Sequence, residues 1–297
     1  MAIKTVQAII NGQTTSLNYN ESTGKYEAII TAPSKSSFNL DGGYYPVTVK
    51  ATDTANNTTT KDATDGTLGT SLRLVVKEKV APVLSFTYPS SGAYLANNKP
   101  TFKWKVTDAD SGVNSGTIAI TIDSGSKITS GITKTAVTGG YECSYTPTTA
   151  LGDGSHTIKI DATDNDGNAA TTKSLTFKVD TVPPTLNLTS PANNLVTNNK
   201  TLTVSGTTND ATSSPVTVKV NGTAVTVGTN GAFSTTVTLT EGTNTITVVA
   251  TDTAGKSSTV TRTVTLDTKA PTIKSVTLTP NPADAGKTFV ITVEVTD

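Results

Sequence analysis

Apolar residues alternate with polar ones along most of the chain, and the pattern repeats. In three segments, 42–53, 153–164 and 241–252, a Gly stands ten residues before the Asp of an Ala-Thr-Asp turn. Apolar side chains fall on every second position between them, which is the period of a half-buried β-strand. These positions are Val47, Val49 and Ala51, then Ile158, Ile160 and Ala162, then Ile246, Val248 and Ala250. The pattern predicts one strand written three times.

Two further sets of related strands precede these segments. The nearer set carries an aromatic residue on the face that we expect to be buried, at Tyr26, Tyr141 and Phe233. The farther set includes VQAIING and VTVKVNG, which both end in the Asn-Gly pair that favours a type I′ hairpin. Each repeat is therefore predicted to be a meander of short strands.

Stretches marked by proline separate the repeats, and a new pair of strands follows each one. The prolines stand at Pro82, Pro184 and Pro271, which are 102 and 87 residues apart. This spacing is close to the roughly 100 residues of a seven-stranded sandwich. We therefore predict two complete sandwiches, at residues 80–181 and 182–268.

The two ends of the chain hold complementary parts of the repeat. Residues 1–79 contain the later strands of a sandwich but lack its first two strands, A and B. Residues 269–297 correspond to an A-B strand pair alone. We predict that these segments are fragments of incomplete domains.

Several motifs resemble tandem bacterial immunoglobulin-like (Big-type) domains, as found in phage appendage proteins and bacterial surface adhesins. These motifs are the linkers VDTVPPT and LDTKAPT, the ATDTAG turn, and the Gly-x-(Tyr/His/Asn) that opens strand F. The resemblance implies an all-β fold of tandem immunoglobulin-like β-sandwiches in an elongated rod, with split domain fragments at both ends. The chain departs from the pattern because it lacks the inter-sheet cysteine pair, and its Trp104 aligns with Val204 and not with the usual strand C position.

Composition excludes several classes of function. The 23 basic and 23 acidic residues give no electrostatic footprint for nucleic acid. No run of 18 apolar residues occurs, so we expect no membrane insertion, and the first residues do not resemble a signal peptide. The single cysteine, Cys143, forms no intrachain disulfide and belongs to no Cys/His motif for zinc.

The Ala-Thr-Asp turn at 162–168 has one feature of a calcium loop. Asp164, Asp166 and Asn168 offer oxygen atoms at every second residue. The pattern then fails, because Ala169 and Leu175 stand where a Gly and a Glu are required. We expect a turn whose Asp accepts hydrogen bonds from its own backbone, and we expect no cofactor.

Calcium stays open as an alternative because the linkers also carry acidic residues. Asp180 and Asp267 could share an ion with the turns of neighbouring domains, as in related modular surface proteins. The first linker has Glu78 at this place and no matching Asp.

No motif indicates an enzyme. His156 is the only His and falls in the same repeat as Cys143, which raises the question of a Cys/His nucleophile. In the repeat alignment, however, Cys143 matches Ala28 and Thr235, whereas His156 matches Tyr45 and Asn244 at a position that resembles a tyrosine corner. We expect structural roles for both.

The leading hypothesis is a structural subunit of an extracellular or phage-associated fibre, located on a virion or on a bacterial cell surface. The C-terminal strand pair of one chain would complete the N-terminal unit of the next, giving a head-to-tail homopolymer or a contact with neighbouring structural proteins. The expected interface residues are Ile273, Val276, Leu278, Phe289, Ile291, Val293 and Val295 on the donor and Val6, Ala8 and Ile10 on the acceptor. The alternative is an adhesin that binds glycans or a receptor, for which Tyr44, Tyr88 and Tyr94 are candidates.

Overall fold

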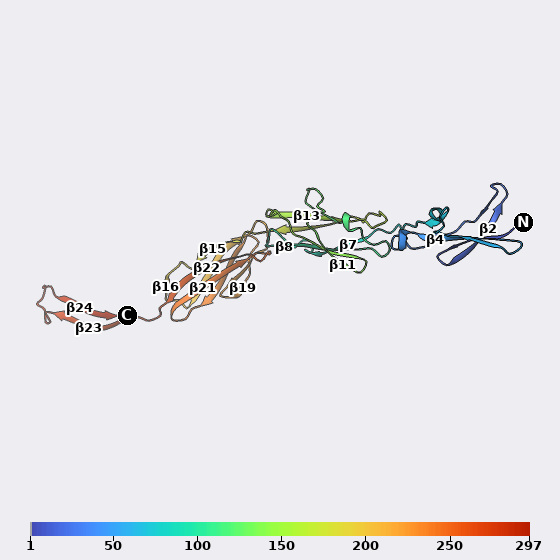
Figure 1. The fold of residues 1–297 in the computed structure, drawn as a ribbon. Coiled ribbons are helices and arrows are strands. Elements are labelled where there is room, and N and C mark those ends of the chain that lie inside the picture. The colour runs from blue at the N-terminus through green and yellow to red at the C-terminus, as the bar shows by residue number, and fades with distance from the viewer. Residues whose placement is uncertain (1) are drawn as a thin grey trace. The chain divides into compact units, whose positions relative to one another are not determined.

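The computed structural model of the protein describes residues 2–297, and strands make up nearly all of its regular structure (Figure 1). Among these residues the only helical elements are three short 3₁₀ turns, η1 (Asp41–Gly43), η2 (Gly69–Leu72) and η3 (Ser115–Thr117). None of the described helices is long and apolar enough to cross a membrane. The chain divides into two compact units, Met1–Ala93 with Asn98–Lys178, and Tyr94–Asn97 with Val179–Asp297. The all-β prediction is confirmed.

The N-terminal part of the first unit is one open sheet. Its strand order is β3-β2-β1-β4-β5, with β6 also paired to β4. The strands are β1 (Ile3–Ile10), β2 (Gln13–Asn20), β3 (Lys25–Glu27), β4 (Tyr45–Asp53), β5 (Thr58–Lys61) and β6 (Arg73–Leu74). Ala8, Tyr45 and Ala63 are its only buried hydrophobic residues within the described positions 2–79. Tyr26 and Tyr141, which we expected to be buried, are both half-exposed, so that prediction holds only for Phe233.

The remainder of the first unit is a sandwich with a closed core. One sheet has the order β11-β12-β9-β7, and the facing strands run β10-β13-β14. The strands are β7 (Val83–Tyr88), β9 (Phe102–Thr107), β10 (Ala119–Ile122), β11 (Thr133–Val137), β12 (Gly140–Tyr145), β13 (Gly154–Asp161) and β14 (Lys173–Val179). Trp104, Phe102 and Phe177 are almost fully buried, and the two Phe rings pack edge to face. The core therefore relies on the alternating positions of β9 and β14.

The second unit contains another sandwich. Its sheets have the orders β15-β17-β20 and β16-β22-β21-β18-β19. The strands are β15 (Thr185–Ser190), β16 (Leu195–Thr197), β17 (Thr201–Asn209), β18 (Thr217–Val220), β19 (Thr223–Val225), β20 (Ala232–Thr238), β21 (Gly242–Thr251) and β22 (Ser257–Leu266), and the unit also includes the short β8 (Tyr94–Leu95). Val204 and Phe233 from one sheet meet Val248 and Val264 from the other. The period-2 alternation thus predicted Val248 correctly, and the burial expected of Phe233 is also confirmed.

Two predicted hairpin turns have the expected backbone. Asn11 and Gly12 have φ of 48° and 77°, and Asn221 and Gly222 have φ of 47° and 82°. A type I′ turn needs positive φ at both central residues, which Asn and Gly tolerate best. The Asn-Gly prediction is confirmed at both turns.

Candidate functional site

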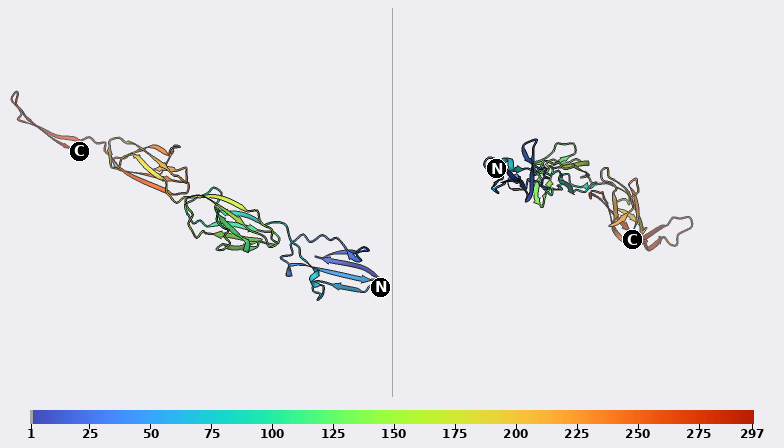
Figure 2. Two further views of the ribbon diagram at one scale, coloured as in Figure 1. Left: turned by 90° about the horizontal axis from the view of Figure 1, so that it is seen from above. Right: turned by 90° about the vertical axis from the view of Figure 1, so that its right-hand side faces the viewer.

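The C-terminal strands form an isolated hairpin with one apolar face. Strands β23 (Thr272–Thr279) and β24 (Val290–Thr296) pair only with each other, and Figures 1 and 2 show no third strand beside them. Directly opposed residues share a face of the hairpin. The opposed apolar pairs are Ile273–Val295, Val276–Val293 and Leu278–Ile291. The opposite face carries Ser275–Glu294, Thr277–Thr292 and Thr279–Val290, so it is mostly polar and the hairpin is amphipathic.

The apolar face of this hairpin is open to solvent. Exposed fractions are 64% for Ile273, 56% for Val276, 42% for Leu278, 58% for Ile291, 46% for Val293 and 51% for Val295. Phe289, just before β24, is 49% exposed. All seven predicted donor residues are therefore exposed, and the six within strands share one face.

The corresponding hairpin in the first unit shows what such a face covers in a complete sandwich. There β7 pairs with β9 through Leu84–Val106 and Phe86–Trp104. Aligning Pro82 with Pro271 makes Leu84–Val106 the counterpart of Ile273–Val295. Leu84 is 3% exposed and Val106 is fully buried. The same strand pair is thus buried in one repeat and exposed in the other.

The N-terminal sheet has the opposite deficit, a face without a covering layer. Val6, Ala8 and Ile10 point to the same side of β1 and lie opposite Ala51, Val49 and Val47 of β4. Ala8 is buried, whereas Val6 and Ile10 are only half-buried. The structure therefore places all three predicted acceptor residues on one sheet face.

An unpaired segment follows β3 at the edge of this sheet. Residues 28–31 continue from β3 without strand pairing, and Ile29 is fully exposed. In the repeat alignment residues 28–30 correspond to 143–145, the second half of β12, and β12 pairs with β9 along its whole length. The N-terminal unit thus lacks a neighbour for this segment within its own sheet.

The three Ala-Thr-Asp turns are closed by their own Asp residues. Oδ1 of Asp53 accepts hydrogen bonds from the backbone N–H groups of Ala55 and Asn57. Asp164 and Asp252 accept the backbone N–H four residues further on, at 2.7 and 2.9 Å. The side-chain hydrogen bond from Asn57, with the backbone bonds, lowers the pKa of Asp53. The predicted backbone bonding of the turn is confirmed.

Two acidic clusters could hold a cation. Glu78, Asp108 and Asp164 form the first, and Asp180, Asp210 and Asp252 form the second, each with ligand atoms within 4.8 Å of one another. The sequence already pointed to the linker acids and to the turn acids as candidate ligands, namely Glu78 and Asp180, and Asp164 and Asp252. Asp108 and Asp210 were missed, although each directly follows the second strand of its repeat.

Neither part of the supposed Cys/His pair is arranged for nucleophilic catalysis. Cys143 is buried on β12, and burial raises the pKa of its thiol to about 11. His156 lies on β13, in the other sheet, where its Nδ1 is 2.9 Å from Oδ2 of Asp123 and its Nε2 is 2.7 Å from the carbonyl oxygen of Gly152. Burial alone would lower the pKa of His156, but these two acceptors raise it.

The corner position of His156 is structurally equivalent in all three repeats. Tyr45 donates its hydroxyl to the carbonyl oxygen of Lys35 at 3.2 Å, and Asn244 donates Nδ2 to that of Thr240 at 2.7 Å. His156 meets the Gly152 carbonyl in the same way. The tyrosine-corner interpretation of this position is confirmed.

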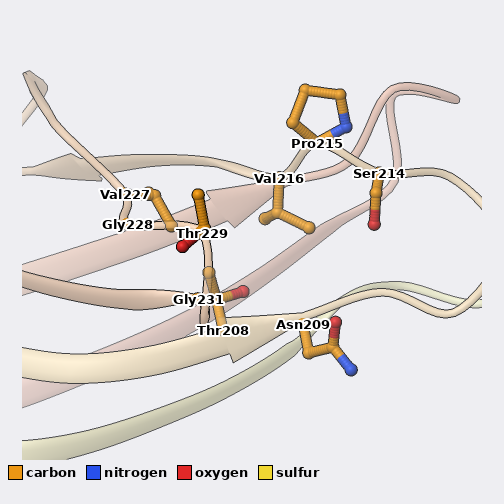
Figure 3. A pocket seen from close by; sticks show the side chains of 9 residues that line it. All are labelled: Thr208, Asn209, Ser214, Pro215, Val216, Val227, Gly228, Thr229 and Gly231. Atoms are coloured by element: carbon orange, nitrogen blue, oxygen red, sulfur yellow. The ribbon is translucent and has the colours of Figure 1, made fainter.

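One surface pocket in the second unit is lined without charged or aromatic side chains. It measures about 310 Å³ and lies between the C-terminal end of β17 and the segment before β18 (Figure 3). No lining residue is charged or aromatic; the lining consists of Thr208, Asn209, Ser214, Pro215, Val216, Val227, Gly228, Thr229 and Gly231. Such a surface offers no general acid or base.

The three candidate tyrosines differ in their surroundings. The guanidinium of Arg73 lies 4.9 Å from the ring centre of Tyr44. Tyr88 is 42% exposed, and Tyr94 is half-buried. Tyr44 thus has a cation against its ring within its own unit.

Comparisons with known families agree with this fold. Residues 89–181 match the model of a bacterial Ig-like domain, and residues 184–268 match that of domain B of glucodextranase. The chain thus contains tandem immunoglobulin-like domains, as the sequence resemblance indicated. A search of curated proteins gave no match.

Solved structures are similar at low identity. Fibronectin(III)-like modules of Clostridium thermocellum CbhA are 18% identical, with a TM-score of 0.40, over 62% of this chain and 94% of that one. The I-band fragment I67–I69 from titin is 14% identical, with a TM-score of 0.39, over 89% of this chain and 88% of that one.

Proposed function

We propose that this protein is a non-enzymatic structural subunit of an extracellular or phage-associated fibre whose copies join head to tail. Tandem immunoglobulin-like domains are structural or adhesion-type modules. The observation that carries the finer proposal is the exposed apolar face of the β23–β24 hairpin, whose counterpart in the first unit is buried. A second copy of the chain offers the matching deficit, an N-terminal sheet without strands A and B.

The complete sandwich of the first unit supplies a register for this contact. There β9 pairs with β12 through Val106–Tyr141, Trp104–Cys143 and Phe102–Tyr145. Transferred by the repeat alignment, the pairs between two copies are Val295–Tyr26, Val293–Ala28 and Ile291–Ile30. Main-chain hydrogen bonds along such an added strand supply affinity, and alternate side chains supply specificity.

Burial of the apolar face supplies the driving force. Each Val, Leu, Ile or Phe side chain contributes roughly 1.5–3 kcal/mol on full burial. A tail-to-head contact is heterologous, so it closes into a ring or extends into a filament.

The test is the size of the full chain by light scattering over a wide range of concentration. The apparent mass of the wild-type chain should grow with concentration. The Val293→Asp variant should stay monomeric because it places a charge on the apolar face. Thr292→Asp, on the opposite face of the hairpin, is the matched control and should still assemble. A monomeric wild-type chain, or assembly that persists in Val293→Asp, would contradict the proposal. In that case, binding to a glycan array would favour the adhesin alternative.

A further inference from the structure

Three carboxylates of the second unit converge from separate segments of the chain. Asp180 directly follows β14, Asp210 directly follows β17, and Asp252 directly follows β21. One oxygen of each lies within 4.8 Å of the others. Oxygen ligands of one calcium ion, each 2.3–2.6 Å from it, lie about 5 Å apart or less. The spacing therefore fits a shared ion.

The backbone holds one oxygen of each carboxylate in place. Asp180 accepts from the N–H of Val182 at 3.1 Å, and Asp252 accepts from that of Lys256 at 2.9 Å. Asp210 accepts two backbone N–H groups, at 2.8 and 2.6 Å. The group is thus oriented before any ligand arrives.

The other oxygens of two of these carboxylates have no partner. Asp180 is 1% exposed and Asp252 is 6% exposed, and Oδ2 of each is buried without a hydrogen bond. The salt bridges described within residues 2–297 join Lys61 to Asp65, Lys127 to Asp161 and His156 to Asp123, and involve none of the three acids. Buried carboxylates require a cation, a hydrogen bond or a proton.

The equivalent cluster of the first unit is satisfied differently. Oδ2 of Asp164 accepts the side-chain amide of Asn168 at 2.6 Å, and the same amide donates to the carbonyl oxygen of Glu78. Oε1 of Glu78 accepts the N–H of Ser111 at 2.7 Å, although Oγ of Ser111 is buried without a partner. Lys256 replaces Asn168 in the second unit, so no such amide reaches Asp252 there.

We infer that Asp180, Asp210 and Asp252 form a calcium-binding site, and that the cluster around Asp164 does not bind calcium comparably. The site contains only oxygen ligands, which hard cations prefer, and its ligands come from loops, which suit the flexible geometry of calcium better than the strict octahedron of magnesium. The inference departs from our sequence-based expectation of no cofactor. It is independent of the proposed assembly.

The experiment is equilibrium dialysis of the full chain, first freed of metal by a chelator, against radioactive calcium. Wild type should bind one calcium per chain. Asp252→Asn, which keeps the shape of the side chain, should lose at least tenfold in affinity. Asp164→Asn is the matched control at the same turn and should retain wild-type affinity.

Circular dichroism of each variant checks folding, and Asp210→Asn replaces Asp252→Asn if the latter does not fold. Absence of calcium binding to wild type, unchanged affinity in a folded Asp252→Asn variant, or loss of binding in Asp164→Asn would overturn the inference. Equal competition by magnesium at the same concentration would overturn the assignment to calcium.

Discussion

Replacing Val204 by alanine should destabilise the second sandwich, whereas the same change at Val293 should not destabilise the dilute chain. The two residues occupy corresponding places in β17 and β24. Val204 is fully buried between the sheets, and Val293 is 46% exposed. The pair therefore compares one side chain in a complete domain and in an unpaired hairpin.

The expected loss of stability follows from the atoms that the substitution removes. Valine to alanine removes two carbons, worth about 0.8 kcal/mol each in transfer, and a cavity cost adds to this, so we expect about 2–3 kcal/mol for Val204→Ala. In a domain of 60–100 residues, each kcal/mol shifts the melting temperature by roughly 4–8 °C, so the expected fall is about 10–20 °C. Val293→Ala should stay within about 0.5 kcal/mol of wild type, as surface substitutions do.

Calorimetry at a protein concentration below the assembly range measures both variants. Only the transition of the second sandwich should move in Val204→Ala. Light scattering at higher concentration should then show weaker assembly for Val293→Ala. The reasoning fails if Val204→Ala melts at the same temperature as wild type, or if Val293→Ala shifts the melting temperature of any transition in the dilute chain.

Two further outcomes follow from single contacts. Gly231→Ala should destabilise the second sandwich more than Gly222→Ala. Both glycines have positive φ, but only a Cβ at position 231 would clash, at 2.0 Å from the carbonyl oxygen of Thr208. Urea unfolding measures the stability of both variants, and equal losses would contradict the clash. The pKa of His156 is raised in the folded state, so the folded protein binds this proton more tightly than the unfolded chain does. The proton therefore adds to the free energy of unfolding in full below about pH 6.5, and this stabilisation is lost as the pH rises through the higher folded pKa. Melting curves from pH 5 to 8 should show this loss in wild type but not in His156→Asn, and the same pH dependence in both would refute it.

The sequence predicted the strands well because the relevant signals are local. Alternation marks which side chains face the core, and Val248 and Phe233 are indeed buried. The Asn-Gly pairs specify positive φ at two hairpins without help from the rest of the chain. The same alternation misled at Tyr26 and Tyr141, which were expected to be buried and are only half-buried.

The acidic clusters depended on contacts that no local pattern contains. Asp180, Asp210 and Asp252 are separated by 30 and 42 residues in the chain, and only the strand order brings their ends together. The spacing within the turn at 162–168 does not match a calcium loop, and the possible ion shared by Asp180 with a turn did not include Asp210. The role of Asn168 also depends on contacts, since its amide reaches both Asp164 and Glu78.

The most direct test of head-to-tail assembly is a disulfide between two copies at the proposed register. A chain carrying Ala28→Cys and Val293→Cys should form a ladder of covalent oligomers on mild oxidation. Reduction of the disulfides should return these oligomers to single chains. Cys143 is buried and should not take part. Ala28→Cys with Glu294→Cys, whose side chain points to the other face of β24, should give far less product. Equal cross-linking of the two pairs, or none in either, would contradict the shared sandwich.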